Sequence, residues 1–208
     1  MYDQPLAALH ATLATILSLL RDSNQRAVVI GGVAAATLGQ PRFTHDVDLC
    51  ATLTNQDLRA FYQAAAERGL QARMADFVEF SKRSRMILLH DVGTDTDIDI
   101  SMAALPFELE AIERALALDV GGLVVPIVSP EDLIIMKAVA KRPQDRADIQ
   151  AVLDSHPGLD LARVRFYLPQ FADALDDPEI VEGFERQVRE WHERREQDAR
   201  HPWPPLAP

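Results

Sequence analysis

Two short segments in which aspartate alternates with an aliphatic residue constrain the fold of this 208-residue chain most strongly. They are Asp46-Val47-Asp48-Leu49 and Asp97-Ile98-Asp99-Ile100. Such alternation is typical of a β-strand with one face in the core, and residues i and i+2 of a strand point to the same face. Each segment therefore predicts a strand that buries its aliphatic side chains and presents two carboxylates together on the opposite face.

A glycine pair, Gly31 and Gly32, precedes the first acidic strand, and 13 residues separate Gly32 from Asp46. The pair follows an apolar run at residues 27–30 and precedes a small apolar segment at residues 33–38, so it lies between a predicted strand and a predicted short helix. Backbone N–H groups at a helix start bind phosphate oxygens, and a missing side chain permits close approach. The pair alone completes neither a Walker A loop nor a dinucleotide fingerprint.

The remaining patterning predicts an α+β fold, in which a small mixed β-sheet is backed by helices and is followed by a helical C-terminal half. Helical spacing, caps and breakers predict helices over residues 5–20, 55–68, 106–118, 130–141 and 143–153, and from residue 159 onward. Further strands are predicted over residues 84–89 and 123–128. The expected organisation is an α/β core over 1–128, a helical region over 129–200 packed on the core, and an irregular tail over 201–208.

Composition narrows the function classes. The chain has 21 basic and 32 acidic residues and a formal charge of −11, so it is a poor non-specific binder of nucleic acid or anionic membrane. Its single cysteine, Cys50, excludes an intrachain disulfide and fits a reducing compartment. The N-terminus lacks the basic start of a signal peptide, and no apolar run approaches the ~18 residues of a membrane span. We therefore expect a cytoplasmic protein with no membrane partner.

The paired carboxylates are candidate metal ligands. Two like charges so close together repel each other, and a divalent cation removes that penalty. Carboxylate oxygens suit Mg²⁺ or Mn²⁺, and a third acid from a neighbouring strand would complete the site around Asp46 and Asp48. We choose Asp99 because of its distance from the helix predicted to begin at Pro106, while Asp97 on the same face stays open. A solvated strand face is the alternative interpretation of an isolated Asp-x-Asp.

The sequence of a strand ending in Gly-Gly, an Asp-x-Asp strand and a further strand acid resembles the nucleotidyltransferase superfamily of the polymerase-beta type. The resemblance is closest to AbiEii-type nucleotidyltransferases, a group that includes toxins of bacterial toxin–antitoxin systems. It rests on Arg42-Phe43-Thr44-His45-Asp46-Val47-Asp48-Leu49 and on residues 131–138 and 142–149. The matched stretch runs from about residue 27 to 155.

This resemblance implies a metal-dependent enzyme that transfers a nucleoside monophosphate from a nucleoside triphosphate (NTP) to an acceptor and releases pyrophosphate. The residues implied as catalytic and as ligands of Mg²⁺ or Mn²⁺ are Asp46, Asp48 and Asp99. The residues implied in nucleotide binding are Gly31, Gly32, Arg42, Thr44, Lys137 and Asp148. Asp99 would also act as base toward the acceptor, whereas Arg42 and Thr44 would touch the triphosphate or only shape their loop.

Several points stay open at this stage. Asp145 and Asp148, three apart on a predicted helix, would orient Lys137 or the acceptor, or pair with arginines of their own helix. Lys137 itself is either a phosphate ligand or a snorkelling lysine at the edge of the core. His90 is interpreted as the end of a hairpin strand rather than a site residue.

The acceptor is open among RNA, a protein side chain and a small aminoglycoside-like molecule, and the partner is open between an antitoxin and a homodimer. The net charge disfavours RNA unless basic residues gather on one side: Arg73, Lys82, Arg83, Arg85, Lys141, Arg142 and Arg146. The alternative function is a module of this fold that binds a nucleotide or a protein without turnover. A sugar-nucleotide glycosyltransferase ranks lower, because only 45 residues precede Asp46.

Overall fold

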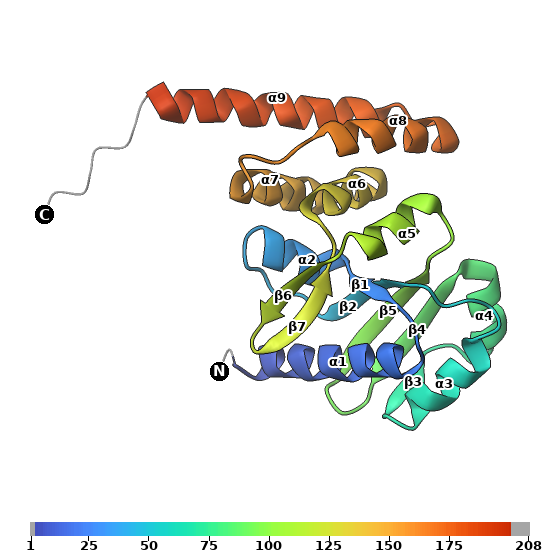
Figure 1. Ribbon diagram of the computed structural model, residues 1–208. Helices are drawn as coiled ribbons and strands as arrows, with labels where there is room; N and C mark the ends of the chain where they lie inside the picture. Colours follow the sequence, from blue (N-terminus) through green and yellow to red (C-terminus); the bar gives the residue numbers. More distant parts are fainter. Residues whose placement is uncertain (1–2, 201–208) are drawn as a thin grey trace, which may run out of the picture. The chain divides into compact units, whose positions relative to one another are not determined.

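The computed structural model describes residues 3–200 (Figure 1). The chain divides into two compact units, residues 1–129 and residues 130–208, here called unit 1 and unit 2. Unit 1 contains the strands, and the elements of unit 2 are helices. The tail predicted over residues 201–208 lies outside the described residues. Packing of the helical region on the core stays a prediction.

The strands of the described chain form one seven-stranded mixed sheet, in the order β3-β4-β5-β2-β1-β7-β6. They are β1 (Ala27–Val29), β2 (Asp46–Ala51), β3 (Leu70–Ala72), β4 (Met86–Asp91), β5 (Thr96–Met102), β6 (Leu116–Val120) and β7 (Leu123–Ile127). The β2–β5 and β1–β7 pairs are parallel, and the other neighbours are antiparallel. This sheet and the helical second half confirm the predicted α+β fold.

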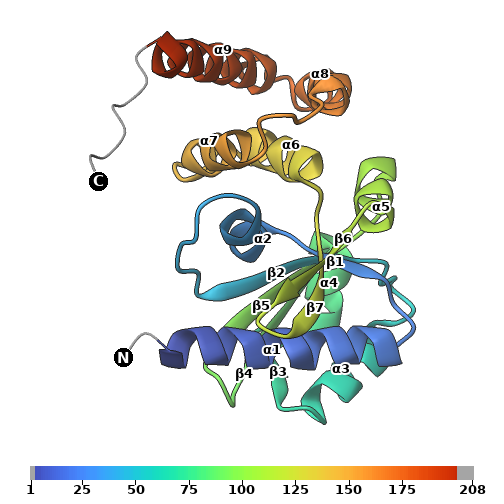
Figure 2. The ribbon, with the colours of Figure 1, turned by 60° about the vertical axis from the view of Figure 1, so that its left-hand side comes forward.

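Helices cover both faces of the sheet in unit 1. They are α1 (Asp3–Asp22), α2 (Gly31–Leu38), α3 (Leu58–Ala66), α4 (Phe77–Ser84) and α5 (Pro106–Glu113). Figures 1 and 2 show α1 on one side of the sheet and α2 on the other. Helix α1 buries an apolar stripe that includes Leu13, Ile16 and Leu20, and it contacts β2, β5 and β7. Burial of such a stripe against the sheet is the main favourable term in forming a core of this kind.

Unit 2 is an arrangement of helices with its own buried core. Its elements are α6 (Pro130–Ala140), α7 (Asp145–Ser155), α8 (Ala162–Leu175) and α9 (Glu179–Arg200). Helix α6 contacts the other three. Helix α9 is rich in charge, yet Ile180, Phe184, Val188 and Trp191 are buried at helical spacing along one face. Among residues 3–200, none of the helices combines the length and apolar character needed to cross a membrane.

The structure corrects the expected elements in two places. The helix predicted over residues 106–118 ends at Glu113, and β6 begins at Leu116. Leucine and alanine at residues 116–118 favour a helix, but pairing of β6 with β7 across the Gly121-Gly122 turn overrides that local preference. Strand β3 and helix α4 were not predicted, because the segment between residues 69 and 84 shows no clear period.

Candidate active site

Four aspartates of the two acidic strands lie side by side on one face of the sheet, here called the acid face. The register of the parallel strands β2 and β5 places Asp46 opposite Asp97 and Asp48 opposite Asp99. All four residues are half-buried, whereas the intervening aliphatic residues have no exposed surface. The alternation seen in the sequence therefore produces two neighbouring carboxylate pairs on this face, and each pair has one acid from β2 and one from β5.

The glycine pair lies directly against this face. Gly31 begins α2 with φ = +61°, and a Cβ placed on it would overlap the carboxylate of Asp48 and lie 2.6 Å from the Asp48 Cβ. The Gly32 N–H points to Asp48 Oδ2 at 3.4 Å, and a Cβ on Gly32 would lie 3.0 Å from the Thr44 Cβ. Thr44 Oγ1 in turn donates to Asp46 Oδ1 at 2.8 Å. The pair, Thr44 and both aspartates of β2 thus form one continuous group.

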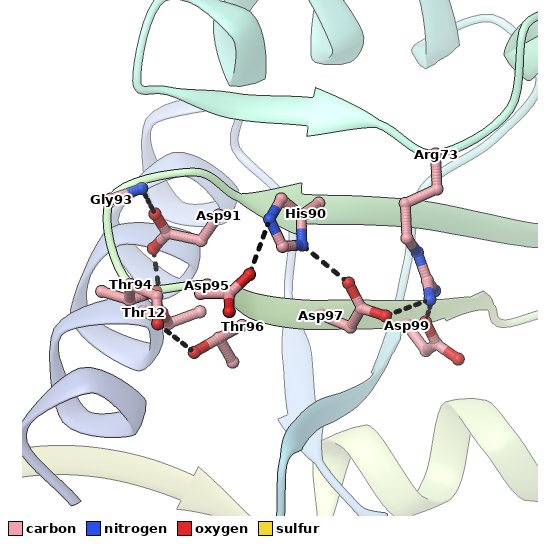
Figure 3. Close-up of polar contacts among 10 residues, drawn as sticks. All are labelled: Thr12, Arg73, His90, Asp91, Gly93, Thr94, Asp95, Thr96, Asp97 and Asp99. Atoms are coloured by element: carbon pink, nitrogen blue, oxygen red, sulfur yellow. Dashed lines mark hydrogen bonds and ion pairs between the residues drawn. The ribbon is translucent and has the colours of Figure 1, made fainter. Parts of the chain in front are cut away.

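Arg73 and His90 hold the carboxylates of β5 (Figure 3). Arg73 Nη1 lies 2.7 Å from Asp97 Oδ2, and its Nη2 forms a second ion pair with Asp99 Oδ1. His90 Nδ1 lies 2.9 Å from Asp97 Oδ1. Partial burial works to raise the pKa of Asp97, but contact with His90 and the charge of Arg73 together hold that pKa below its ordinary value. Asp97 is therefore a carboxylate at neutral pH.

Helix α1 anchors the hairpin that carries these residues. Thr12 Oγ1 donates to Asp91 Oδ2 at 2.9 Å and lies 2.6 Å from Thr94 Oγ1 (Figure 3). The other oxygen of Asp91 accepts the Gly93 N–H at 3.0 Å. Because Asp91 is buried, these hydrogen bonds compensate its desolvation and fix the β4–β5 turn.

The acid face opens into a cavity of about 330 Å³. Its lining residues are His45, Asp46, Arg73, His90, Asp95, Asp97 and Asp99. Sequence reasoning placed Arg73 only among scattered basic residues and His90 at a strand end, so it missed both as parts of this cavity. The strand order β3-β4-β5 brings them there, and a pattern read along the chain carries no information on that order.

The residues match a divalent cation in ligand chemistry. The oxygens of Asp46, Asp48 and Asp99 are the donors that Mg²⁺ and Mn²⁺ prefer. Within residues 3–200, no group of three or more His, Cys, Asp or Glu side chains already converges on one metal position. Asp48 faces Gly32, and Asp99 is engaged by Arg73. The three carboxylates would therefore need to exchange these contacts in order to share a cation.

Three further residues are predicted nucleotide ligands: Arg42, Lys137 and Asp148. Arg42 lies in the loop before β2, where its Nη1 is 3.5 Å from the Phe43 carbonyl oxygen. In unit 2, Lys137 is nine-tenths buried, with Nζ at 2.9 Å from Asp145 Oδ1 and 2.7 Å from Asp148 Oδ2. Both aspartates therefore hold Lys137, which does not snorkel to solvent. A role of Arg42, Lys137 or Asp148 in nucleotide binding stays a prediction.

The architecture matches solved nucleotidyltransferase structures. The solution structure of the antibiotic-resistance factor ANT(2'')-Ia is 16% identical, with a TM-score of 0.56 over 85% of this chain and 95% of that chain. ANT(2'')-Ia in complex with adenylyl-2''-tobramycin is 16% identical, with a TM-score of 0.52 over 79% and 97%. An antigenic nucleotidyltransferase-like protein from Paracoccidioides brasiliensis is 14% identical, with a TM-score of 0.52 over 86% and 91%. These similarities define a nucleotidyltransferase fold.

The amino-acid sequence also matches a defined protein family. Residues 9–182 match the family described as "Nucleotidyl transferase of unknown function (DUF2204)", and the chain belongs to this family. No curated protein matches the chain. The superfamily predicted from the glycine pair and the acidic strands is confirmed, whereas the AbiEii-type subgroup stays a prediction.

Proposed function

We propose that this protein is a metal-dependent enzyme that transfers a nucleoside monophosphate from an NTP to an acceptor, with release of pyrophosphate. One observation carries the proposal: the glycine pair at the start of α2 touches Asp48, and Asp48 lies level with Asp99 on a parallel neighbouring strand. This adjacency supports the proposal, because transfer at a phosphorus atom needs a backbone that can bind phosphate next to carboxylates that can bind a metal.

The proposed roles follow from these positions. The N–H groups of Gly31 and Gly32 bind triphosphate oxygens, and Thr44 keeps Asp46 in place through its hydrogen bond. Asp46, Asp48 and Asp99 hold Mg²⁺ or Mn²⁺, which when bound supplies charge stabilisation at the reacting phosphate. The acceptor oxygen forms a bond to the α-phosphorus, the bond from that phosphorus to the pyrophosphate oxygen breaks, and Asp99 takes the acceptor proton.

A small hydroxyl-bearing molecule is the acceptor that the site favours. The cavity of about 330 Å³ is within the size range of small-molecule sites. The solved neighbour with adenylyl-2''-tobramycin holds an adenylylated small molecule, which supports the same class here. RNA is less favoured, because the basic residues of unit 1 considered for it are already engaged with carboxylates. These pairs are Arg73 with Asp97 and Asp99, Lys82 with Glu79, Arg83 with Asp76, and Arg85 with Glu108.

The AbiEii-type resemblance adds a finer proposal: a toxin of a cytoplasmic toxin–antitoxin system, with an antitoxin or a second copy of the chain as partner. Residues 131–138 and 142–149 support it, since Lys137 from the first motif meets Asp145 and Asp148 from the second in one buried cluster. The competing idea, a binding module without turnover, needs the same fold but no reaction.

Labelled NTP separates these ideas. Each of the four NTPs, labelled at the α-phosphate, is incubated with Mn²⁺ and in turn with an aminoglycoside, bulk RNA and a protein extract. We expect label transfer and pyrophosphate release with one acceptor class, and loss of both in Asp48→Asn. Asp119→Asn is the matched control, because Asp119 is exposed and accepts the Gly122 N–H in the β6–β7 turn. NTP binding without transfer to any acceptor would favour the binding module.

A further inference from the structure

The position of Arg73 is fixed by the sheet. Arg73 follows the edge strand β3, and its N–H donates to the Leu88 carbonyl oxygen at 3.0 Å, which extends the β3–β4 pairing by one residue. Gln71 pairs with His90, so two residues further along, Arg73 projects on the same face as His90. From there its side chain reaches past β4 to the carboxylates of β5 (Figure 3).

The guanidinium group contacts two carboxylates at once. Its Nη1 and Nη2 atoms bind Asp97 and Asp99, which stand two residues apart on one strand face. The Arg73 side chain is 28% exposed, so the contacts are partly shielded from water. The planar guanidinium fork directs one donor nitrogen at each of the two acids.

Asp99 is also the acid proposed as third metal ligand. A divalent cation at Asp99 and the guanidinium of Arg73 would compete for the same carboxylate, and two cations so close repel each other. We propose that Arg73 is a positioning residue that serves as the resident counter-ion of Asp97 and Asp99 and gives up Asp99 when a divalent cation binds. This inference rests on the proposed function, because it requires the cation site at Asp99.

The proposal predicts that removing the charge of Arg73 tightens metal binding. Titration of the full-length protein with Mn²⁺ alone, without NTP, measures this by calorimetry or by the electron paramagnetic resonance signal of free Mn²⁺. We expect Arg73→Gln to lower the Kd for Mn²⁺ about threefold to tenfold, the range for losing partly exposed ion pairs and one nearby positive charge. Arg73→Lys keeps the charge and should return most of the way to the wild-type Kd.

Arg83→Gln is the matched control. It removes the same charge from unit 1 and breaks a more exposed ion pair, in which Arg83 of α4 lies 3.5 Å from the N-cap residue Asp76. Helix α4 contributes no acid-face residue. Its Kd should equal that of the wild type. Circular dichroism spectra confirm that all variants are folded before the titrations are compared.

The outcomes separate this inference from the proposed function. If the wild type binds Mn²⁺ through Asp48 but Arg73→Gln binds it equally or more weakly, the counter-ion role is refuted and the metal-dependent function stands. If neither the wild type nor Arg73→Gln binds Mn²⁺, the proposed metal site and the counter-ion role both fail. If Arg73→Gln and Arg83→Gln lower the Kd for Mn²⁺ equally, the change in net charge alone explains the effect, and the counter-ion role is also refuted.

Discussion

Replacing Gly31 with alanine tests how closely the glycine pair approaches the acid face. Gly31 has φ = +61°, a conformation that costs an L-residue roughly 1–2 kcal/mol. The added Cβ would also overlap the Asp48 carboxylate and lie 2.6 Å from the Asp48 Cβ. Rotation of the carboxylate relieves only the first of these contacts, so β2 or α2 must move, at a cost of about 1–3 kcal/mol for overpacking. The total expected loss of stability is about 2–5 kcal/mol.

Gly69→Ala is the matched control, because it isolates the backbone cost. Gly69 has φ = +79°, but a Cβ there would meet no atom within 4 Å. It should therefore lose only the roughly 1–2 kcal/mol of conformational strain. The difference between the two variants, about 1–3 kcal/mol, measures the contact with Asp48.

Urea unfolding measures the stability of both glycine variants. Trp191 is buried in unit 2, and the sequence of unit 1 contains no tryptophan, so tryptophan fluorescence follows unit 2 while far-UV circular dichroism follows both units. The transition seen by circular dichroism should shift more in Gly31→Ala than in Gly69→Ala. Equal shifts in the two glycine variants would show that Gly31 does not approach Asp48 as described.

Three further predictions concern single groups. Burial raises the pKa of the Cys50 thiol to about 11 despite its hydrogen bond with Ser101. At pH 8 only about one molecule in a thousand then carries the reactive thiolate. Iodoacetamide should therefore label Cys50 slowly until urea unfolds unit 1. Rapid labelling of the folded protein would contradict this. Lys137→Met leaves Asp145 and Asp148 buried without their cation and should lower the free energy of unfolding of unit 2 by about 3–5 kcal/mol, measured by fluorescence. Lys141→Met is the control: it breaks a more exposed pair with Asp177 and should cost about 1 kcal/mol or less. Similar losses in the two lysine variants would argue against a buried ionic cluster. Hydrogen bonds from Arg165 outweigh partial burial and lower the pKa of Glu185. The Arg165–Glu185 pair therefore stabilises unit 2 fully at pH values above 4.5, the ordinary pKa of Glu, and this contribution is lost as the pH falls through the lowered pKa. Glu185→Gln should remove roughly 0.2–1 kcal/mol at pH 7 and almost nothing at pH 2, and an equal effect at both pH values would exclude an ionic origin.

The sequence predicts those parts of the fold in which local pattern and tertiary environment agree. Asp46 to Leu49 alternates because β2 buries one face, and the same holds for β5, so both strands and the face of their acids were predictable. Residues 116–118 have helical composition, yet they form β6 because pairing with β7 stabilises a strand there. The Gly121-Gly122 step was the available signal for that hairpin.

A pattern along the chain does not predict the site residues that the order of strands in the sheet brings together. Arg73 follows a three-residue strand with no period of its own, and it reaches Asp99 only because β3, β4 and β5 are neighbours. His90 lines the cavity for the same reason. In unit 2, the spacing of Asp145 and Asp148 predicted a shared helix face, but pairing with Lys137 rather than with local arginines depends on how α6 packs against α7.

The central claim is that the glycine pair and the acid face together bind an NTP with a divalent cation. Calorimetric titration of each of the four NTPs with Mg²⁺ or Mn²⁺ into the wild type, the double variant Asp46→Asn/Asp48→Asn and the control Asp119→Asn tests it most directly. We predict metal-dependent binding of at least one NTP to the wild type and the control, and none to the double variant. NTP binding that survives in the double variant, or that is equally strong without metal, would contradict the account.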